Sequence, residues 1–250
     1  MSELHIPVMA PQGALLDHAA RALSDLNTQI GGSWFDAARP GAEPGQWADR
    51  SAARRVAQAH MPQAPALFDD IDGRQALILS TGENCGYRVE KLLDSGIWSA
   101  ALIWHPAPAA EETRSLLAAR GEGKANYLYL HQDAALEVEL RDNDGTASLR
   151  LPAMGDGWQA VMIARAGAQL RIWRPADDAR AEGMVTGDLP AMADLLIGAR
   201  SHRAGMPKTL GAGAIGGVLV WPGHDLLAAD PTPAARSLRD AFANLCLWEL

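Results

Sequence analysis

Residues 158–221, which begin WQAVMIARAGAQLRIWRP and end IGGVLVW, decide the fold of this chain. Within them, residues 158–165 and 169–173 alternate apolar and other side chains on either side of an Ala166-Gly167 connection. Such alternation is typical of strands with one buried face and one wet face, and the short connection predicts a hairpin. Two further apolar runs, at 194–199 and 215–221, follow between Gly-rich loops. The stretch therefore predicts the closing half of a β-sandwich.

The chain before this stretch supplies the other strands. Turn signals such as Asn-Asp-Gly and Gly-Asp-Gly separate them at short intervals. No helical pattern of useful length lies between them, which excludes the alternating strands and helices of a parallel sheet. We therefore predict an all-β fold, an antiparallel jelly-roll sandwich of two sheets. Its predicted strands are residues 75–80, 87–93, 97–104, 115–119, 126–132, 135–140, 146–151, 158–165, 169–173, 194–199 and 215–221.

Both ends of the chain favour helices. Residues 11–30 carry apolar side chains at three- and four-residue spacing, and Gly31-Gly32 ends this pattern, so we expect an amphipathic helix that docks on the body of the protein or on a partner. Residues 31–47 are rich in Gly and Pro and indicate a loop or linker. Asp49 is then expected to cap a short helix that ends near His60.

The C-terminal residues predict a second helix. Thr232 is its expected cap and Pro233 its first turn. Its apolar stripe is Ala235, Leu238, Phe242 and Leu245. The predicted organisation is a helical N-terminal docking segment and linker (1–65), a sandwich (66–230) and a C-terminal helix (231–250).

Composition narrows the class of protein. Of the 250 residues, 48% are apolar and 21% charged, as in ordinary globular chains. The net charge of −8 argues against nucleic-acid binding, which needs a basic surface. Cys85 and Cys246 match no metal or redox spacing, so two buried free thiols are expected.

The chain shows no sign of targeting to a membrane or of secretion. The N-terminal residues have no basic segment followed by an uninterrupted apolar run, so no secretory signal is expected. No segment reaches the ~20 apolar residues of a membrane span. We therefore expect synthesis in the cytoplasm and no membrane insertion.

The order of several sequence features resembles that of a known family. The run QALILSTGENCGYRVEKLL is followed by IWSAALIWHPAP, by the hairpin WQAVMIARAGAQLRIW, by LLIGA and by IGGVLVW. This order is similar to that of concanavalin A-like jelly rolls, and among them laminin-G-like and pentraxin-like domains, over about residues 73–230. The resemblance implies a two-sheet sandwich. It does not select a function, because that fold serves lectins, adhesins, glycosidases, lyases and structural modules.

Two arrangements are candidates for catalysis. Glu137 and Glu139 alternate on one predicted strand, as the paired acids of glycosidases of this fold do, but the further acid of that pattern is absent. Arg88 with Glu90, and Tyr127 with Tyr129 and His131, alternate in a way that is similar to polysaccharide lyases, although the motif order differs and no Gln-x-His is present. In both cases the alternative is an ordinary solvated or packed strand face.

The segment Asp142-Asn143-Asp144 offers oxygen ligands for Ca²⁺, as laminin-G-like domains often do. The same residues, followed by Gly145, are also what a tight hairpin turn requires. The turn is the favoured reading, and Ca²⁺ is the alternative.

Sugar binding by such sandwiches uses aromatic rings together with amides, carboxylates and guanidinium groups. Trp158 and Trp173 are expected in the core, while Trp104 and Trp221, at strand ends beside Pro, are the expected exposed rings. The candidate ligand-binding residues are Tyr87, Trp104, His105, Asn126, Arg200, His202, Arg203 and Trp221.

Three functions remain open from the sequence. The first is a non-catalytic, lectin-like module that binds cell-surface polysaccharide, as a spike or fibre of a phage-like particle in which residues 1–70 contact other chains. The second is a polysaccharide hydrolase or lyase on the same fold. The third is a structural or oligomerisation module of an assembly.

Overall fold

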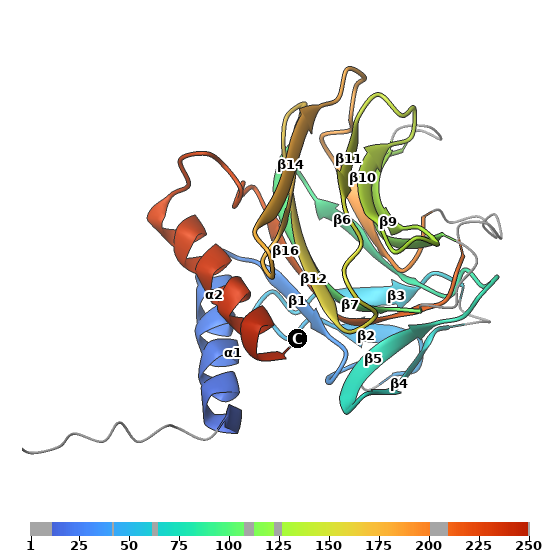
Figure 1. The fold of residues 1–250 in the computed structure, drawn as a ribbon, viewed down its shortest axis with the longest axis vertical. Helices are drawn as coiled ribbons and strands as arrows, with labels where there is room; N and C mark the ends of the chain where they lie inside the picture. The colour runs from blue at the N-terminus through green and yellow to red at the C-terminus, as the bar shows by residue number, and fades with distance from the viewer. Residues whose placement is uncertain are drawn as a thin grey trace, which may run out of the picture.

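The computed structural model describes residues 12–41, 43–61, 65–107, 113–122, 127–200 and 210–249. In these residues two antiparallel sheets stack face to face, and two helices lie side by side against one of them (Figure 1). The predicted two-sheet antiparallel sandwich, with a helix near each end of the chain, is therefore confirmed.

The first sheet has the strand order β14-β13-β12-β7-β16-β5-β4, and β1 pairs with β16 beside this path. Every pair in it is antiparallel. Its strands are β1 (Ser33–Asp36), β4 (Leu67–Ile71), β5 (Arg74–Leu79), β7 (Ile97–Pro106), β12 (Gln159–Ala166), β13 (Gln169–Arg174), β14 (Ala179–Met184) and β16 (Gly213–Pro222).

The second sheet has the order β11-β10-β9-β8-β15-β6-β3-β2, again antiparallel throughout. Its strands are β2 (Gln46–Ala48), β3 (Val56–Ala59), β6 (Tyr87–Leu93), β8 (Arg114–Arg120), β9 (Tyr127–Gln132), β10 (Val138–Asp142), β11 (Ser148–Leu151) and β15 (Ala193–Ile197).

Every strand predicted from alternation is present, with ends shifted by at most a few residues. The turn of the β12–β13 hairpin lies one residue later than predicted, because Ala166 pairs with Gln169 and Gly167-Ala168 makes the connection. Gly167 adopts a φ of 63°, which suits glycine in a tight hairpin. Strands β4 and β14 were not predicted from the sequence. None of their residues is fully buried, so they lack the apolar alternation of the other strands.

Residues 31–60 differ from the prediction. The expected loop contains β1 and β2, and the expected short helix that ends near His60 is instead strand β3, so both expectations are wrong. The carboxylate of Asp49 accepts hydrogen bonds from the Trp34 and Ser51 amides, each at 2.8 Å, and so holds a turn. Strand β1 belongs to the first sheet, and strands β2 and β3 belong to the second. Residues before the predicted boundary near residue 66 therefore contribute strands to the sandwich. A docking role for residues 1–65 stays a prediction.

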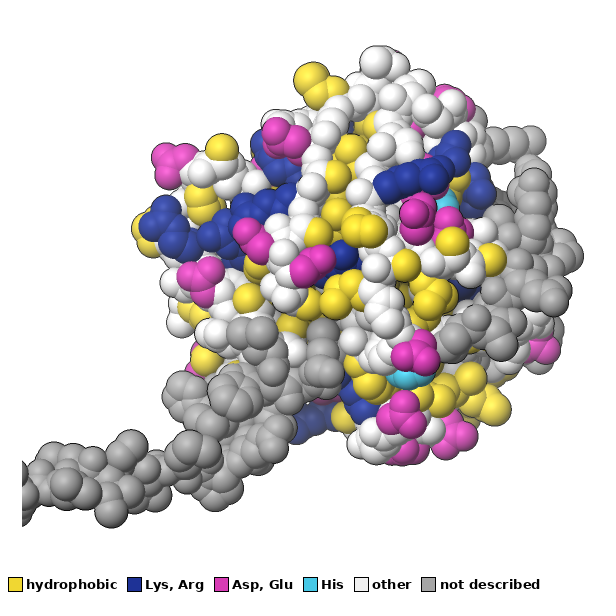
Figure 2. All heavy atoms as spheres, in the orientation of Figure 1, with side chains coloured by type: hydrophobic (Ala, Val, Ile, Leu, Met, Phe, Trp, Pro, Cys, Tyr) yellow, Lys and Arg dark blue, Asp and Glu magenta, His cyan; other side chains and the backbone are white. Residues whose placement is uncertain are grey.

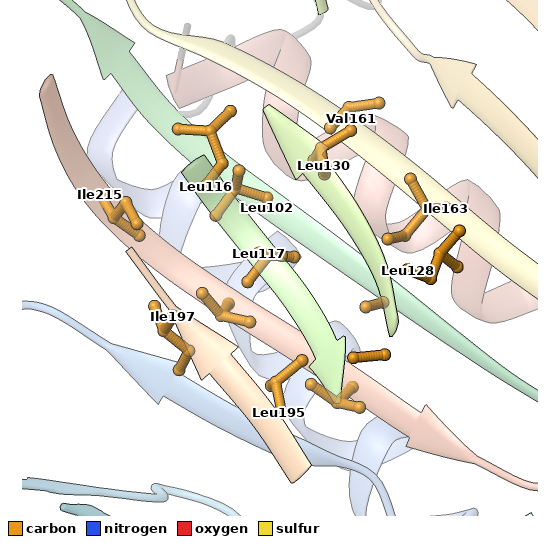
Figure 3. Packing of buried hydrophobic residues seen from close by; sticks show 14 of the residues in the cluster. Leu102, Leu116, Leu117, Leu128, Leu130, Val161, Ile163, Leu195, Ile197 and Ile215 are labelled. Carbon is orange, nitrogen blue, oxygen red and sulfur yellow. The ribbon is translucent and has the colours of Figure 1, made fainter. Parts of the chain in front are cut away.

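The main core fills the space between the two sheets. Inward-facing side chains such as Leu102 and Ile163 of the first sheet meet Leu117, Leu130 and Leu195 of the second (Figure 3). Each of these five is at most 3% exposed. Removing so much apolar surface from water is the main stabilising contribution to the fold.

A second core lies between the first sheet and the two helices, α1 (Gln12–Gln29) and α2 (Pro233–Glu249). The predicted cap of α2 is confirmed, since Thr232 Oγ1 accepts a hydrogen bond from the Ala235 amide at 3.2 Å. All four residues of the predicted stripe of α2 are buried. The two helices therefore cover the outer face of the first sheet (Figure 1).

Two smaller expectations are also checked by the structure. Cys85 and Cys246 are buried and unbridged, as predicted. Neither helix, over its described residues, is long and apolar enough to span a bilayer.

Candidate functional site

The two sheets differ in what covers their outer faces. Helices bury the outer face of the first sheet, whereas the outer face of the second sheet carries polar and charged side chains. Alternation along its strands places these side chains outward, because their neighbours point into the core. Acidic and basic groups gather around a histidine over β9 and β10 (Figure 2). The outward residues of β6 and β9 to β11 are Arg88, Glu90, Tyr129, His131, Glu139, Arg141, Ser148 and Arg150.

Glu139 is the centre of this face. It is 5% exposed, and the registers of β9, β10 and β11 place it opposite His131 on one side and Arg150 on the other. One carboxylate oxygen accepts a hydrogen bond from the Ser148 hydroxyl. The other lies 3.1 Å from His131 Nε2 and 3.5 Å from Arg150 Nη2. A buried carboxylate is thus surrounded by donors, as its burial requires.

These contacts set the protonation of the pair. Burial alone would raise the pKa of Glu139, but the hydrogen bond from the Ser148 hydroxyl and the interactions with His131, Arg150 and Arg141 outweigh burial and lower that pKa. Burial also lowers the pKa of His131, and the charge of Arg141 adds to this effect, while the carboxylate of Glu139 opposes it. At neutral pH, an ionised Glu139 therefore accepts a hydrogen bond from Nε2–H of a neutral imidazole.

Tyr129 links this cluster to the rest of the face. Its ring stacks on His131 at 5.3 Å between centroids, and the Arg200 guanidinium lies 4.0 Å from its centroid. Arg200 also donates a hydrogen bond to Asn143 Oδ1 at 3.3 Å. On its other side Tyr129 packs with Ala118, Leu196 and Ala199.

A hollow of about 820 Å³ lies next to this apolar group, where β8 ends and β15 begins. Leu196 belongs both to the Tyr129 cluster and to the wall of the hollow. Arg88, Lys91 and Arg120 supply its cations, and Asp194 and Glu122 its acids. The charged cluster and the hollow therefore both lie on the outer side of the second sheet, joined by the buried group around Leu196.

The aromatic residues predicted to be exposed are not. Trp104 and Trp221 are 0% exposed and Tyr87 is 1% exposed, so their prediction as ligand-contacting rings is wrong. Trp104 lies in the core between the sheets, where Nε1 donates to Gln132 Oε1 at 2.9 Å. Trp221 lies beneath the helices. They belong to β7 and β16, neighbouring strands within the first sheet, which the second sheet covers on one face and the helices on the other.

The remaining residues singled out from the sequence lie in different parts of the molecule. Arg200 lies on the outer face of the second sheet, in contact with Tyr129. His105 lies elsewhere, 3.4 Å from Asp72 and edge-on to the Trp158 ring. Trp173 is buried as expected, while Trp158 is partly exposed. Asn126, His202 and Arg203 lie outside the described residues.

The predicted calcium ligands form the turn between β10 and β11. The carboxylate of Asp142 accepts hydrogen bonds from the Ala147 amide at 2.7 Å and from the Thr146 hydroxyl at 2.9 Å. Gly145 adopts a φ of 71°, as such a turn requires. Over the described part of the chain, no three His, Cys, Asp or Glu side chains lie close enough together to hold a metal ion. The hairpin reading accounts for Asp142, Asn143 and Asp144.

The two predicted acids share one cation. Arg150 lies 3.7 Å from Glu137 and 3.5 Å from Glu139. The lyase-like residues Arg88, Tyr129 and His131 do face the same side of the second sheet. The sequence reading missed Ser148, Arg150, Lys91 and Asp194. Alternation on β11 indicates an outward Ser148 and Arg150, but nothing local indicates that they meet Glu139.

The burial of His131 predicts a stability that depends on pH. Because its pKa is lowered in the folded state, the unfolded chain binds a proton more readily as the pH falls through the ordinary value of about 6.5. The free energy of unfolding is expected to fall from pH 7 to pH 5, and to fall less in a His131→Gln variant. Urea unfolding across this range checks the prediction; equal slopes for both proteins would contradict it.

Comparisons with known proteins agree on the fold. No family model matches the chain, and a search of curated proteins finds no match. Among solved structures, a Trypanosoma rangeli sialidase in complex with sialic acid matches with a TM-score of 0.61 and 12% identity, over 93% of this chain and 38% of that one. This chain thus spans less than half the length of that sialidase.

Two further structures cover larger shares of their own chains. Domain 4 of AbnA, a GH43 extracellular arabinanase from Geobacillus stearothermophilus in complex with arabinotriose, gives a TM-score of 0.55 at 12% identity, over 82% of this chain and 97% of that domain. The botulinum neurotoxin serotype D binding domain gives 0.54 at 8% identity, over 87% of this chain and 51% of that one. At these identities the likeness shows a shared β fold alone.

Proposed function

We propose that this protein is a non-catalytic, lectin-like module that binds carbohydrate on the outer face of the second sheet, within a concanavalin A-like sandwich. The observation that carries the proposal is the asymmetry of the sandwich. Two helices cover one outer face, while the other bears a charged cluster and a hollow of about 820 Å³. Sugar sites combine such concave surfaces with a few oriented polar groups.

The chemistry of the face suits hydroxyl-rich ligands. Arg150 and Arg141 expose 58% and 32% of their side chains, so their donors reach solvent while Glu139 orients them. Glu137, 41% exposed, supplies an acceptor beside them. The solved structures of similar fold include a sialidase with sialic acid and an arabinanase domain with arabinotriose, which supports a sugar as ligand.

The protonation of Glu139 favours binding over hydrolysis. A glycosidase needs one carboxyl group that is protonated at the working pH, and such a group has a raised pKa. The pKa of Glu139 is lowered instead, and Arg150 neutralises both members of the predicted pair. Hydrolase or lyase chemistry is the alternative, and release of reducing ends or of unsaturated sugars from polysaccharide would reveal it.

A matched pair of variants tests the proposed face. Arg150 on the second sheet and Arg180 on the first expose 58% and 57% of their side chains, and each pairs with an acid. On a glycan array, wild type is expected to bind at least one glycan, and Arg150→Ala is expected to weaken binding by about tenfold. Arg180→Ala is expected to leave it unchanged.

Two results would contradict the proposal. One is that wild type binds no glycan on the array. The other is that Arg150→Ala and Arg180→Ala change binding equally, which would place the ligand elsewhere. Association with a phage-like particle, through residues 1–70, is a separate proposal; co-sedimentation of the protein with such particles would support it, and a free monomer would not.

A further inference from the structure

The hollow on the outer face of the second sheet has its own charge pattern. Arg88 and Lys91 come from β6, and Arg120 from the end of β8. They meet around Asp194 on β15, which pairs with Arg120 in the sheet register. Three cations therefore line a wall that has two acids, Asp194 and Glu122.

The carboxylate of Asp194 is engaged in hydrogen bonds with other groups of the protein. One of its carboxylate oxygens accepts hydrogen bonds from Arg88 Nε at 2.9 Å and Nη2 at 2.7 Å. The other accepts a hydrogen bond from the Lys91 backbone amide at 2.8 Å. The carboxylate thus orients Arg88 and holds the backbone at Lys91, and its charge is already compensated.

Lys91 lies at an irregularity of the sheet. The pairing of β6 with β15 shifts register here, and Lys91 adopts a φ of 49°, a conformation that is unfavourable for a residue with a side chain. Its ammonium has no ion-pair partner among the described residues. A strained backbone position therefore presents an uncompensated positive charge beside the hollow.

The rest of the wall is apolar. Leu196, Met192 and Pro190 line it, and Met192 is 51% exposed. Apolar neighbours weaken solvent screening and so strengthen attraction of an anion by Lys91. Met192 and Pro190 also offer a surface for the apolar side of a sugar ring, whereas Leu196 is buried beneath them.

The outer face of the second sheet differs from the whole chain in its balance of acidic and basic residues. The chain has 30 acidic and 22 basic residues. On this face the basic residues match the acidic ones in number: Arg88, Lys91, Arg120, Arg141, Arg150 and Arg200 beside Glu90, Glu122, Asp133, Glu137, Glu139 and Asp194. The described residues of this face therefore lack the acidic excess of the whole chain.

We infer that the ligand is a carboxylate-bearing polysaccharide, and that the hollow is the subsite where Lys91 receives one carboxylate. This rests on the proposed function and names the class of sugar for the same face. Lys91, whose backbone Asp194 holds, attracts the carboxylate by its charge, and the exposed side chain of Met192 contacts the sugar ring. No bond is formed or broken.

The experiment compares two acidic polysaccharides with the neutral methyl ester of one of them. Binding of wild type to polygalacturonate, to alginate and to fully methyl-esterified polygalacturonate is measured by affinity electrophoresis, together with the glycan array. Wild type is expected to bind at least one of the two polyuronates about tenfold more tightly than the ester, and added salt is expected to weaken only polyuronate binding.

Variants at one position then test the subsite. Lys91→Glu is expected to weaken polyuronate binding about tenfold and Lys91→Gly about fivefold, while Lys91→Arg keeps most of it. Lys91→Gly also removes the unfavourable φ, so its melting temperature is expected to be equal to or above that of wild type. A loss of binding in this variant is therefore not a loss of fold.

The outcomes separate this inference from the proposed function. If wild type binds neutral glycans, or the ester, as tightly as the polyuronates, the acidic ligand class is wrong and the sugar-binding face stands. If polyuronates bind but the Lys91 variants bind them equally well, the subsite is wrong. If no glycan of any kind binds, the proposed function itself fails.

Discussion

Replacement of Arg114 by alanine is expected to lower the free energy of unfolding by about 3–4 kcal/mol. Arg114 is 2% exposed and begins β8. Its Nη1 donates to the carbonyls of Ser80 and Gly211, and its Nη2 to the carbonyl of Gly198 at 2.5 Å. Burial lowers the pKa of this guanidinium. One side chain thus ties the β5–β6 connection to both ends of the β15–β16 connection, and its removal takes this donor from the buried carbonyls of Gly198 and Gly211.

Two further variants show which part of Arg114 matters. Arg114→Met keeps most of the apolar stem but removes every donor, so we expect a loss close to that of alanine. Arg114→Lys keeps a charge but lacks the planar fork, so we expect an intermediate loss. Urea unfolding of the three variants measures these losses. If Arg114→Met is as stable as wild type, packing of the stem, and not hydrogen bonding, holds the connections.

Replacement of Glu139 by alanine is expected to lower the free energy of unfolding by about 2–3 kcal/mol. The loss arises because Ser148 and His131 lose the carboxylate that accepts their hydrogen bonds, while Arg141 and Arg150 can turn toward solvent. Those two arginines also lose their orientation, so glycan binding should weaken together with stability.

The dependence of the free energy of unfolding on acidic pH separates the effect of charge from that of packing at Glu139. The lowered pKa of Glu139 means that its contribution is fully present above its ordinary pKa of about 4.3 and is lost as the pH falls through the lower folded value. Glu139→Gln keeps the volume but cannot titrate, so it should lack this acid step. Urea unfolding between pH 5 and pH 3 measures the step; an equal step in wild type and Glu139→Gln would assign it to other groups.

The strands with strong alternation were predictable because the pleat imposes a period of two on any strand with one buried face. The edge strands β4 and β14 were not, since none of their residues is fully buried and only a few, such as Phe68 and Ala181, pack against the core. Strand β1 has four residues and is held by pairing with β16, a contact between residues far apart in sequence. A pattern read along the chain contains no information on such a partner.

The candidate site was predictable only in part. Alternation places Tyr129 and His131 on one face of β9 and an acid, Glu139, outward on β10. That these groups meet Arg150 and Ser148 depends on the register of β10 with β11. Trp104 and Trp221 were wrongly expected to be exposed. A position beside proline at a strand end indicates nothing about the layers that pack above and below that strand.

The amino-acid sequence by itself determined the two terminal helices and the strands with strong alternation, where the capped helix α2 begins and which of its residues form the buried stripe, because these depend on periodicity and on local hydrogen bonding. Only the tertiary structure decided which sheet the helices cover, and so which outer face keeps its charges in solvent. Lys91 and Asp194 are 103 residues apart in the chain, and only the pairing of β6 with β15 brings them to the same hollow.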